Sequence, residues 1–230
     1  MKGITDRLAK YKHALLLIYY PVMIGQFQWL EKRNAQVSHL IQSPLDDFIP
    51  FVSIFVVPYV FWFAYVAITL LITGLKDRGE FIRVLMSLYI GMTFCNLIYY
   101  LFPHGQPLRV PLTENEPFLF DRLVYFIYSK DTPTNCAPSI HVLFSVACTI
   151  GIQRAGCFKD KPWVKISSHI MNVLIVLSTM FIKQHSIIDV ALGLAFSVFI
   201  YLFVYHIDWP AMWENFLSKA NLKKQAADQI

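Results

Sequence analysis

Six apolar segments, each long enough to cross the hydrocarbon core of a bilayer, limit how this chain can fold more than any other feature of its sequence. They cover about 14–30, 48–74, 84–103, 136–153, 166–182 and 187–205. Because the hydrocarbon core contains no water, each segment must satisfy its backbone hydrogen bonds internally, which favours helices. We therefore predict that residues 1–230 form one all-α domain, an integral membrane bundle of six transmembrane helices. The short connection between the last two segments predicts a tight helical hairpin.

The composition agrees with a membrane protein and argues against other classes. Hydrophobic residues make up 56% of the chain and charged residues only 15%, whereas soluble domains contain about 25% charged residues. Lysines and arginines in loops explain the net charge of +5, so we expect no binding to nucleic acid. The four cysteines show no C-x-x-C spacing, which predicts neither a disulfide framework nor a metal site.

The distribution of lysine and arginine over the loops predicts the orientation of the bundle. Of the 20 such residues, 14 fall on one side of the six segments. These are Lys2, Arg7, Lys10, Lys12, Lys76, Arg78, Arg83, Arg154, Lys159, Lys161, Lys165, Lys219, Lys223 and Lys224. By the positive-inside rule, this side and both termini are cytoplasmic. The compact chain with its short tails favours the cytoplasmic membrane of a bacterium.

The longest connection, residues 104–135, is therefore expected on the extracytoplasmic side. It contains several prolines and a short amphipathic stretch, Phe118–Tyr128. This stretch is compatible with a helix in the membrane interface and equally with a lid packed on the bundle.

Polar residues that a membrane tolerates poorly gather at three places on this extracytoplasmic face. They are Arg109 after the third segment, Ser139 and His141 at the start of the fourth, and Lys183, His185 and Asp189 between the fifth and sixth. All of them fall at the same predicted depth, which indicates one shared site.

His185 and Asp189 are four residues apart, so on a helix they share a face and can form a hydrogen bond. A carboxylate behind an imidazole fixes its tautomer and stabilises the imidazolium, as a nucleophilic or basic histidine requires. The alternative is a structural pair that locks two helices together.

The other polar residues fit the handling of a phosphate group. Pro138 suits the first turn of a helix, so Ser139 and the amides near it would present a helix N-terminus to an anion. His141 would be placed to protonate a leaving oxygen, although a core histidine is the alternative. Arg109 and Lys183 would bind the phosphate, unless they are an exposed loop arginine and a snorkelling lysine. Together these groups suit phosphoryl transfer through a phosphohistidine, which requires no metal or other cofactor.

Two of the three places resemble motifs of the type 2 phosphatidic acid phosphatase superfamily, in particular the branch close to the inositolphosphoceramide and sphingomyelin synthases. The resemblance covers roughly residues 82–205. The family's second motif, Pro-Ser-Gly-His, is matched by residues 138–141 with Ile140 in place of glycine. The third, Ser-Arg-x5-His-x3-Asp, is matched by residues 178–189 with Thr179 in place of arginine.

The family's first motif, Lys-x6-Arg-Pro, is altered in this chain. Arg109 can stand for its arginine, but Phe102 occupies the lysine position and Val110 the proline position. Lys183, one helical turn beyond Thr179, is expected to supply the charge that the third motif lacks.

The resemblance implies that His185 is the nucleophile, that Asp189 orients it and that His141 is the general acid. It implies hydrolysis of a lipid phosphate or diphosphate at the outer face, with that lipid and the surrounding membrane lipids as partners. One alternative is a transferase that passes a phosphoryl-linked group to a lipid hydroxyl. The others are a non-catalytic transporter or lipid-binding protein and a bis-histidine haem or metal protein.

Overall fold

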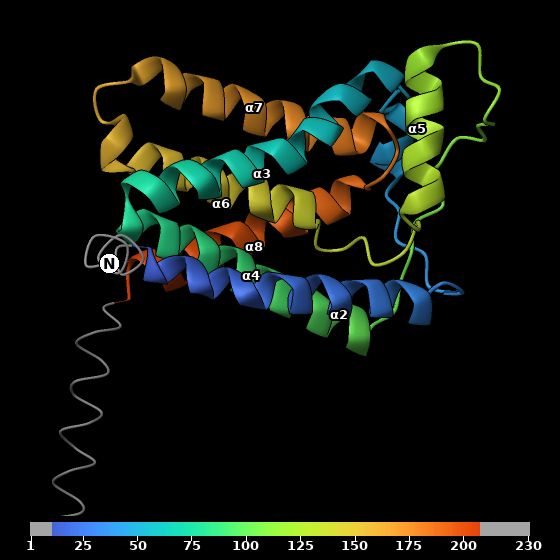
Figure 1. The fold of residues 1–230 in the computed structure, drawn as a ribbon. Helices are drawn as coiled ribbons and strands as arrows, with labels where there is room; N and C mark the ends of the chain where they lie inside the picture. The colour runs from blue at the N-terminus through green and yellow to red at the C-terminus, as the bar shows by residue number, and fades with distance from the viewer. Residues whose placement is uncertain (1–10, 208–230) are drawn as a thin grey trace, which may run out of the picture.

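The computed structural model describes residues 11–207, and this part of the chain is all-helical, without a β-strand. Its α-helices are α2 (Tyr19–Arg33), α3 (Val56–Lys76), α4 (Arg78–Leu101), α5 (Leu119–Lys130), α6 (Ile140–Arg154), α7 (Pro162–Phe181) and α8 (Ile187–Tyr205). Its 3₁₀-helices are η1 (Lys12–Ile18), η2 (Pro44–Phe48), η3 (Ser53–Phe55) and η4 (Gly156–Phe158). Figure 1 shows the long helices side by side and α5 across one end of the bundle.

Four helices in this part of the chain are long and apolar enough to cross a membrane, and they correspond to four of the six expected spans. They are the continuous helix Ser53–Lys76, which joins η3 to α3, and α4, α7 and α8. The expected fourth span corresponds to α6, whose 15 residues cover about 22 Å, less than the hydrocarbon core of about 30 Å. The expected first span corresponds to η1 and α2, which are not among the four.

α6 lies at the centre of the bundle and contacts α3, α4, α7 and α8. Residues along most of its length are buried, so this helix has no face that must meet solvent or lipid. α7 and α8 both pack along α6, which separates them (Figure 1). The expected tight hairpin of these two helices is therefore wrong in its packing, although the turn between them is short.

α5 closes one end of the bundle as a packed lid (Figure 1). Its central residue Val124 is fully buried against Val56, Tyr59 and Ile182, which come from α3 and the end of α7. The amphipathic stretch in the long connection is thus a helix whose apolar strip faces the bundle. This arrangement covers the end at which all the candidate site residues lie.

The described lysines and arginines separate between the two ends of the bundle as the sequence predicts. The end at which α3 leads into α4 carries Lys12, Lys76, Arg78, Arg83, Arg154, Lys159, Lys161 and Lys165. The end covered by α5 carries Lys32, Arg33, Arg109, Arg122, Lys130 and Lys183. The remaining six predicted cytoplasmic residues lie outside residues 11–207, so the side on which the termini lie stays a prediction.

Candidate active site

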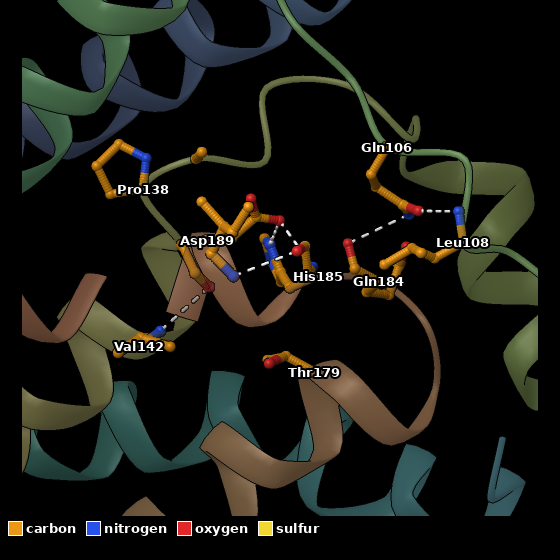
Figure 2. Close-up of polar contacts among 12 residues, drawn as sticks. Gln106, Leu108, Pro138, Val142, Thr179, Gln184, His185 and Asp189 are labelled. Carbon is orange, nitrogen blue, oxygen red and sulfur yellow. Dashed lines mark hydrogen bonds and ion pairs between the residues drawn. The ribbon is translucent and has the colours of Figure 1, made fainter. Parts of the chain in front are cut away.

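The turn between α7 and α8 brings His185 and Asp189 together beneath the lid (Figure 2). Nδ1 of His185 lies 3.2 Å from Oδ2 of Asp189, and the N–H of Ser186 donates to the same oxygen at 3.0 Å. Ser186 and Asp189 form a capping box at the start of α8, which fixes the carboxylate in place. Asp189 is fully buried and His185 is 9% exposed. With Nδ1 directed at the carboxylate, Nε2 of His185 is available for chemistry.

The start of α6 is joined directly to this pair. Ser139 is the N-cap of α6, and its hydroxyl accepts a hydrogen bond from the N–H of Val142. The N–H of Ser139 donates to the backbone carbonyl of Asp189 at 3.1 Å. Ser139 is fully buried and its hydroxyl caps the helix, so the residue positions the start of α6, and its expected contact with phosphate stays a prediction.

His141, in the first turn of α6, faces the same space as His185. The centroids of the two imidazole rings lie 5.6 Å apart. The His141 ring packs against Tyr59 and Trp62, with centroid distances of 4.5 and 4.4 Å. Both histidines line a cavity of about 320 Å³. The structure therefore places together the two histidines that the sequence assigns to one site.

Arg109 lies behind Gln184 instead of lining the cavity. Its Nε and Nη2 donate to Oε1 of Gln184 at 3.1 and 2.6 Å, and its Nη1 donates to the carbonyl of Tyr128 at 3.0 Å. Gln184 lines the cavity, and its side-chain amide donates to Asp131 at 3.2 Å. Burial lowers the pKa of Arg109, an effect that the nearby Asp131 opposes. Arg109 is thus separated from the cavity by one side chain.

Lys183 is two residues from His185, but its ammonium group points elsewhere. Its Nζ donates to the backbone carbonyls of Asp46 and Ile49, at the C-terminal end of η2, at distances of 2.9 and 2.5 Å. The residue has a left-handed backbone conformation with φ 55°. Lys183 thus satisfies loop carbonyls in this arrangement, and its expected contact with phosphate stays a prediction.

Asp46 is a residue of the site that the sequence analysis missed. It is only 2% exposed, and its carboxylate accepts hydrogen bonds from Ser186 Oγ at 2.6 Å and from the N–H of Ile187 at 2.8 Å. A negative charge at this place suits the positive end of the α8 dipole. The sequence signal is a capping box of Ser43 with Asp46, which predicts a short helix but not its contact with α8.

His104 is a second missed residue, and it holds the loop in front of α6. Its Nε2 accepts a hydrogen bond from the N–H of Ala137 at 2.8 Å, and its Nδ1 lies 2.7 Å from the carbonyl of Phe102. One nitrogen accepts and the other donates, so the ring is neutral. Burial lowers the pKa of His104, in agreement with this assignment.

The cavity continues into a long apolar groove. Tyr20, Trp62 and Phe63 line both the cavity and a second space of about 500 Å³ between α3 and the helix formed by η1 and α2. The groove extends to Leu75 near the far end of α3. From Tyr59 to Leu75 the helix rises about 24 Å, so the groove follows α3 through most of its length.

The fold and the site together define an all-helical protein with helices fit to cross a membrane and a His–Asp pair at one end. No family model and no solved structure matches the chain. The chain is similar to an uncharacterized protein of Methanocaldococcus jannaschii, with 25% identity over 155 residues. The similar region is 66% of this chain and spans 60% of the length of that protein. This relative has no described activity to compare with the site.

Proposed function

We propose that the chain is a membrane lipid phosphatase that hydrolyses a lipid phosphate or diphosphate through a phosphohistidine intermediate. The observation that carries this proposal is the cavity shared by His141 and His185, with Asp189 buried behind His185. A positioned nucleophile and a second proton-transfer group are what phosphoryl transfer through a covalent intermediate needs. The resemblance to the second and third motifs of the type 2 phosphatidic acid phosphatases supports the same reaction.

In the first step, Nε2 of His185 attacks the phosphorus atom and the bond from phosphorus to the lipid oxygen breaks. Asp189 accepts the hydrogen bond from Nδ1–H, which keeps Nε2 unprotonated before attack and stabilises the positive charge that develops on the ring. Protonated His141 gives its proton to the leaving oxygen. Its contacts with Tyr59 and Trp62 hold the ring in place beside His185.

In the second step, water attacks the phosphorus of the phosphohistidine and the bond from phosphorus to nitrogen breaks. Neutral His141 takes a proton from the water as this happens. Inorganic phosphate leaves, and both histidines return to the states in which they started. The two steps need one general acid–base, and His141 is the described residue whose ring lies beside that of His185.

The charge of the phosphate would be met by Lys130 and by the start of α6. Lys130, Ile140 and His141 all line the cavity, so a lysine and the first turn of a helix lie at its wall. Arg109 would act through Gln184, whose side-chain amide it holds in place. This arrangement replaces the direct contacts that the sequence suggests for Arg109, Lys183 and Ser139.

The groove beside the cavity supports a lipid substrate with a long tail. A hydrocarbon chain that lay in it would extend from the histidines along α3, shielded by Trp62, Phe63 and Leu70. The phosphate would then be held at the end of the bundle that α5 covers.

Release of phosphate by the detergent-purified protein, measured without added metal, tests the proposal. The substrates are phosphatidic acid, phosphatidylglycerol phosphate and a polyprenyl diphosphate. We expect release by the wild-type protein and none by His185→Ala or His141→Ala. The control is His169→Ala, which removes an exposed histidine of α7 and should keep wild-type activity. Full activity in His185→Ala would contradict the mechanism.

A transferase is the second candidate, because the candidate nucleophile is nearly shielded from water. His185 is 9% exposed and α5 covers this end of the bundle, so a phosphohistidine formed there would meet little bulk solvent. A lipid hydroxyl that entered through the groove would then take the phosphoryl-linked group. A two-lipid exchange assay separates the candidates: exchange without release of phosphate identifies a transferase. Neither activity would favour a non-catalytic transporter or lipid-binding protein.

The proposal includes an extracytoplasmic site and cytoplasmic termini in a bacterial cytoplasmic membrane. The excess of lysine and arginine at the end opposite α5 supports this orientation.

A further inference from the structure

Cys136, His185 and Asp189 form a cluster of metal-ligating groups at the cavity. One donor atom from each residue, a thiol sulfur, a ring nitrogen and a carboxylate oxygen, lies within 4.8 Å of the other two. The three residues come from the loop before α6 and from the turn and first turn of α8. The proposed phosphatase mechanism uses His185 and Asp189 but gives no role to the thiol of Cys136.

A second feature of the cluster indicates a missing cation. Oδ1 of Asp189 is completely buried and has no hydrogen-bond partner among residues 11–207, whereas Oδ2 accepts two hydrogen bonds. A buried carboxylate oxygen without a partner is costly, and buried charges are normally paired or bound to a metal. A cation beside this oxygen would remove that cost.

The donor atoms of the cluster, a sulfur, a nitrogen and an oxygen, are of the types that Zn²⁺ binds, and three protein ligands would leave a fourth position open. Zn²⁺ binds sulfur at about 2.3 Å and nitrogen or oxygen at about 2.0–2.2 Å, which places donor atoms about 3.3–3.5 Å apart. The donor atoms of the cluster lie within 4.8 Å of one another, so binding of the ion requires a contraction of at most about 1.5 Å. Cys136 and His185 line the cavity, so an ion and its fourth ligand can enter from there.

We propose that Cys136, His185 and Asp189 bind a thiophilic divalent cation such as Zn²⁺, and that this ion inhibits the enzyme. Inhibition follows because His185 cannot serve as a metal ligand and as the nucleophile at the same time. Binding of the ion stands on the cluster alone, whereas the inhibitory effect rests on the proposed phosphatase function. The ion would make the reaction sensitive to the supply of zinc on the side of the membrane that the cavity faces.

Titration of the purified protein with Co²⁺ tests binding without reference to activity. The background variant is Cys157→Ser, because Cys157 is the partly exposed cysteine among the described residues. We expect a charge-transfer absorbance band from thiolate to Co²⁺ that Zn²⁺ displaces and that Cys136→Ser abolishes. Cys148→Ser, which removes a buried cysteine of α6 outside the cluster, should keep the band. No band in the background protein, or a band that survives in Cys136→Ser, would overturn the proposal.

Competition with Zn²⁺ measures the loss of affinity. Removal of an outer partner of a metal site costs about 10- to 100-fold in affinity, so loss of a direct ligand in Cys136→Ser should cost at least about 100-fold. Asp189→Asn is a second variant that keeps an acceptor for the capping hydrogen bonds, and it should also bind Zn²⁺ more weakly. Unchanged affinity in both variants, with thermal unfolding like that of the background protein, would place the ion elsewhere.

Inhibition is measured in the phosphate-release assay. Zn²⁺ should inhibit the background protein, and Cys136→Ser should keep basal activity and need at least about tenfold more Zn²⁺ for half-inhibition. The Co²⁺ band in a protein without phosphatase activity would preserve the metal site and reject the proposed function. Phosphatase activity in a protein without the band would preserve the proposed function and reject the metal site. Activity that requires Zn²⁺ would overturn the inhibitory role.

Discussion

Asp189 connects three parts of the site through separate atoms. Its Oδ2 accepts hydrogen bonds from His185 and from the N–H of Ser186, and its backbone carbonyl accepts one from Ser139. The side chain therefore sets the tautomer of the candidate nucleophile, while the main chain holds the start of α6. Substitution of the side chain can separate the chemical role from the structural one.

Asp189→Asn should leave the fold intact and greatly reduce turnover. Asparagine keeps an oxygen that can accept the capping hydrogen bond from Ser186, but its neutral amide no longer favours the proton on Nδ1 of His185 or the imidazolium. A comparable change in a serine protease triad lowers kcat by about 10⁴-fold, and we expect a loss of about 10²–10⁴-fold. Steady-state kinetics and thermal unfolding in detergent measure the two effects. Wild-type turnover in this variant would show that the pair is structural.

His104 should make stability depend on pH through its neutral ring. Burial lowers its pKa below the ordinary value of 6.5, so the unfolded chain binds the proton more readily than the folded protein. The stability from its two hydrogen bonds is therefore complete above pH 6.5 and is lost as the pH falls through and below that value.

The variant His104→Ala tests this dependence. It should be less stable than the wild type by about 1–3 kcal/mol near neutral pH, because both hydrogen bonds are lost. The difference in unfolding temperature should shrink in acid, where the wild-type ring becomes protonated. The same pH series on His39→Ala, an exposed histidine of the neighbouring loop, is the control. A constant difference across the series would reject the neutral role of His104.

The sequence predicts some of these residues better than others, for a physical reason. His185 and Asp189 are only four residues apart, and His185 directly precedes Ser186, the N-cap of α8, so the local geometry of this helix start brings the two side chains together. Lys183 and Asp46 are separated by 137 residues, and their contact depends on how the loop of η2 folds onto α8. Local spacing carries no information on such a contact. The sequence therefore does not show that the ammonium group of Lys183 binds the loop of η2.

At the scale of elements, the close approach of α8 to α6 positions the site. A Cβ atom on Gly193 of α8 would lie 3.0 Å from Cβ of Val142 and 3.1 Å from the backbone oxygen of Ser139. Glycine therefore allows α8 to lie directly against the first turn of α6, which carries His141. Small residues serve the same purpose at other contacts between membrane helices.

Gly193→Ala should affect catalysis more than stability. The added methyl group would push the start of α6 by a few tenths of an ångström, and a displacement of about 1 Å can cost about 100-fold in rate, so we expect a loss of about tenfold in kcat. The matched control is Gly151→Ala, at the other end of α6. Its Cβ would meet Cγ2 of Val84 at a sterically forbidden distance, so it should destabilise the bundle by about 1–3 kcal/mol.

Kinetics and thermal unfolding of the two variants separate these effects. For Gly151→Ala, turnover per folded molecule should stay near that of the wild type. Equal losses of turnover in both variants would show that the contact at Gly193 has no particular connection with the site.

The existence of the long helices is predictable from the sequence, but their packing is not. About 20 apolar residues suffice to identify a span, and α3, α4, α7 and α8 appear where such runs occur. In a bilayer the lipid-facing and protein-facing sides of a helix are both apolar, so the pattern does not show which side packs on which neighbour. The central place of α6 and its position between α7 and α8 therefore come only from the structure.

At the scale of the whole molecule, the two ends of the bundle differ in charge, and the candidate site lies at only one of them. The candidate site, the lid α5 and the mouth of the cavity lie at one end, and the excess of described lysines and arginines lies at the other. By the positive-inside rule, this asymmetry predicts an orientation in which the site faces away from the cytoplasm. A lipid phosphate would then reach His185 from the outer leaflet.

Labelling of single cysteines in intact cells tests this orientation. In the Cys157→Ser background the other three cysteines are buried, so an engineered cysteine provides the reactive thiol. Glu114→Cys lies on the exposed loop before α5, and Asp160→Cys lies on the exposed turn before α7 at the opposite end. We expect an impermeant maleimide to label Glu114→Cys in intact cells and to label Asp160→Cys only after the membrane is opened. The reverse pattern would place the site on the cytoplasmic face, where the same histidine chemistry would act on lipids of the inner leaflet.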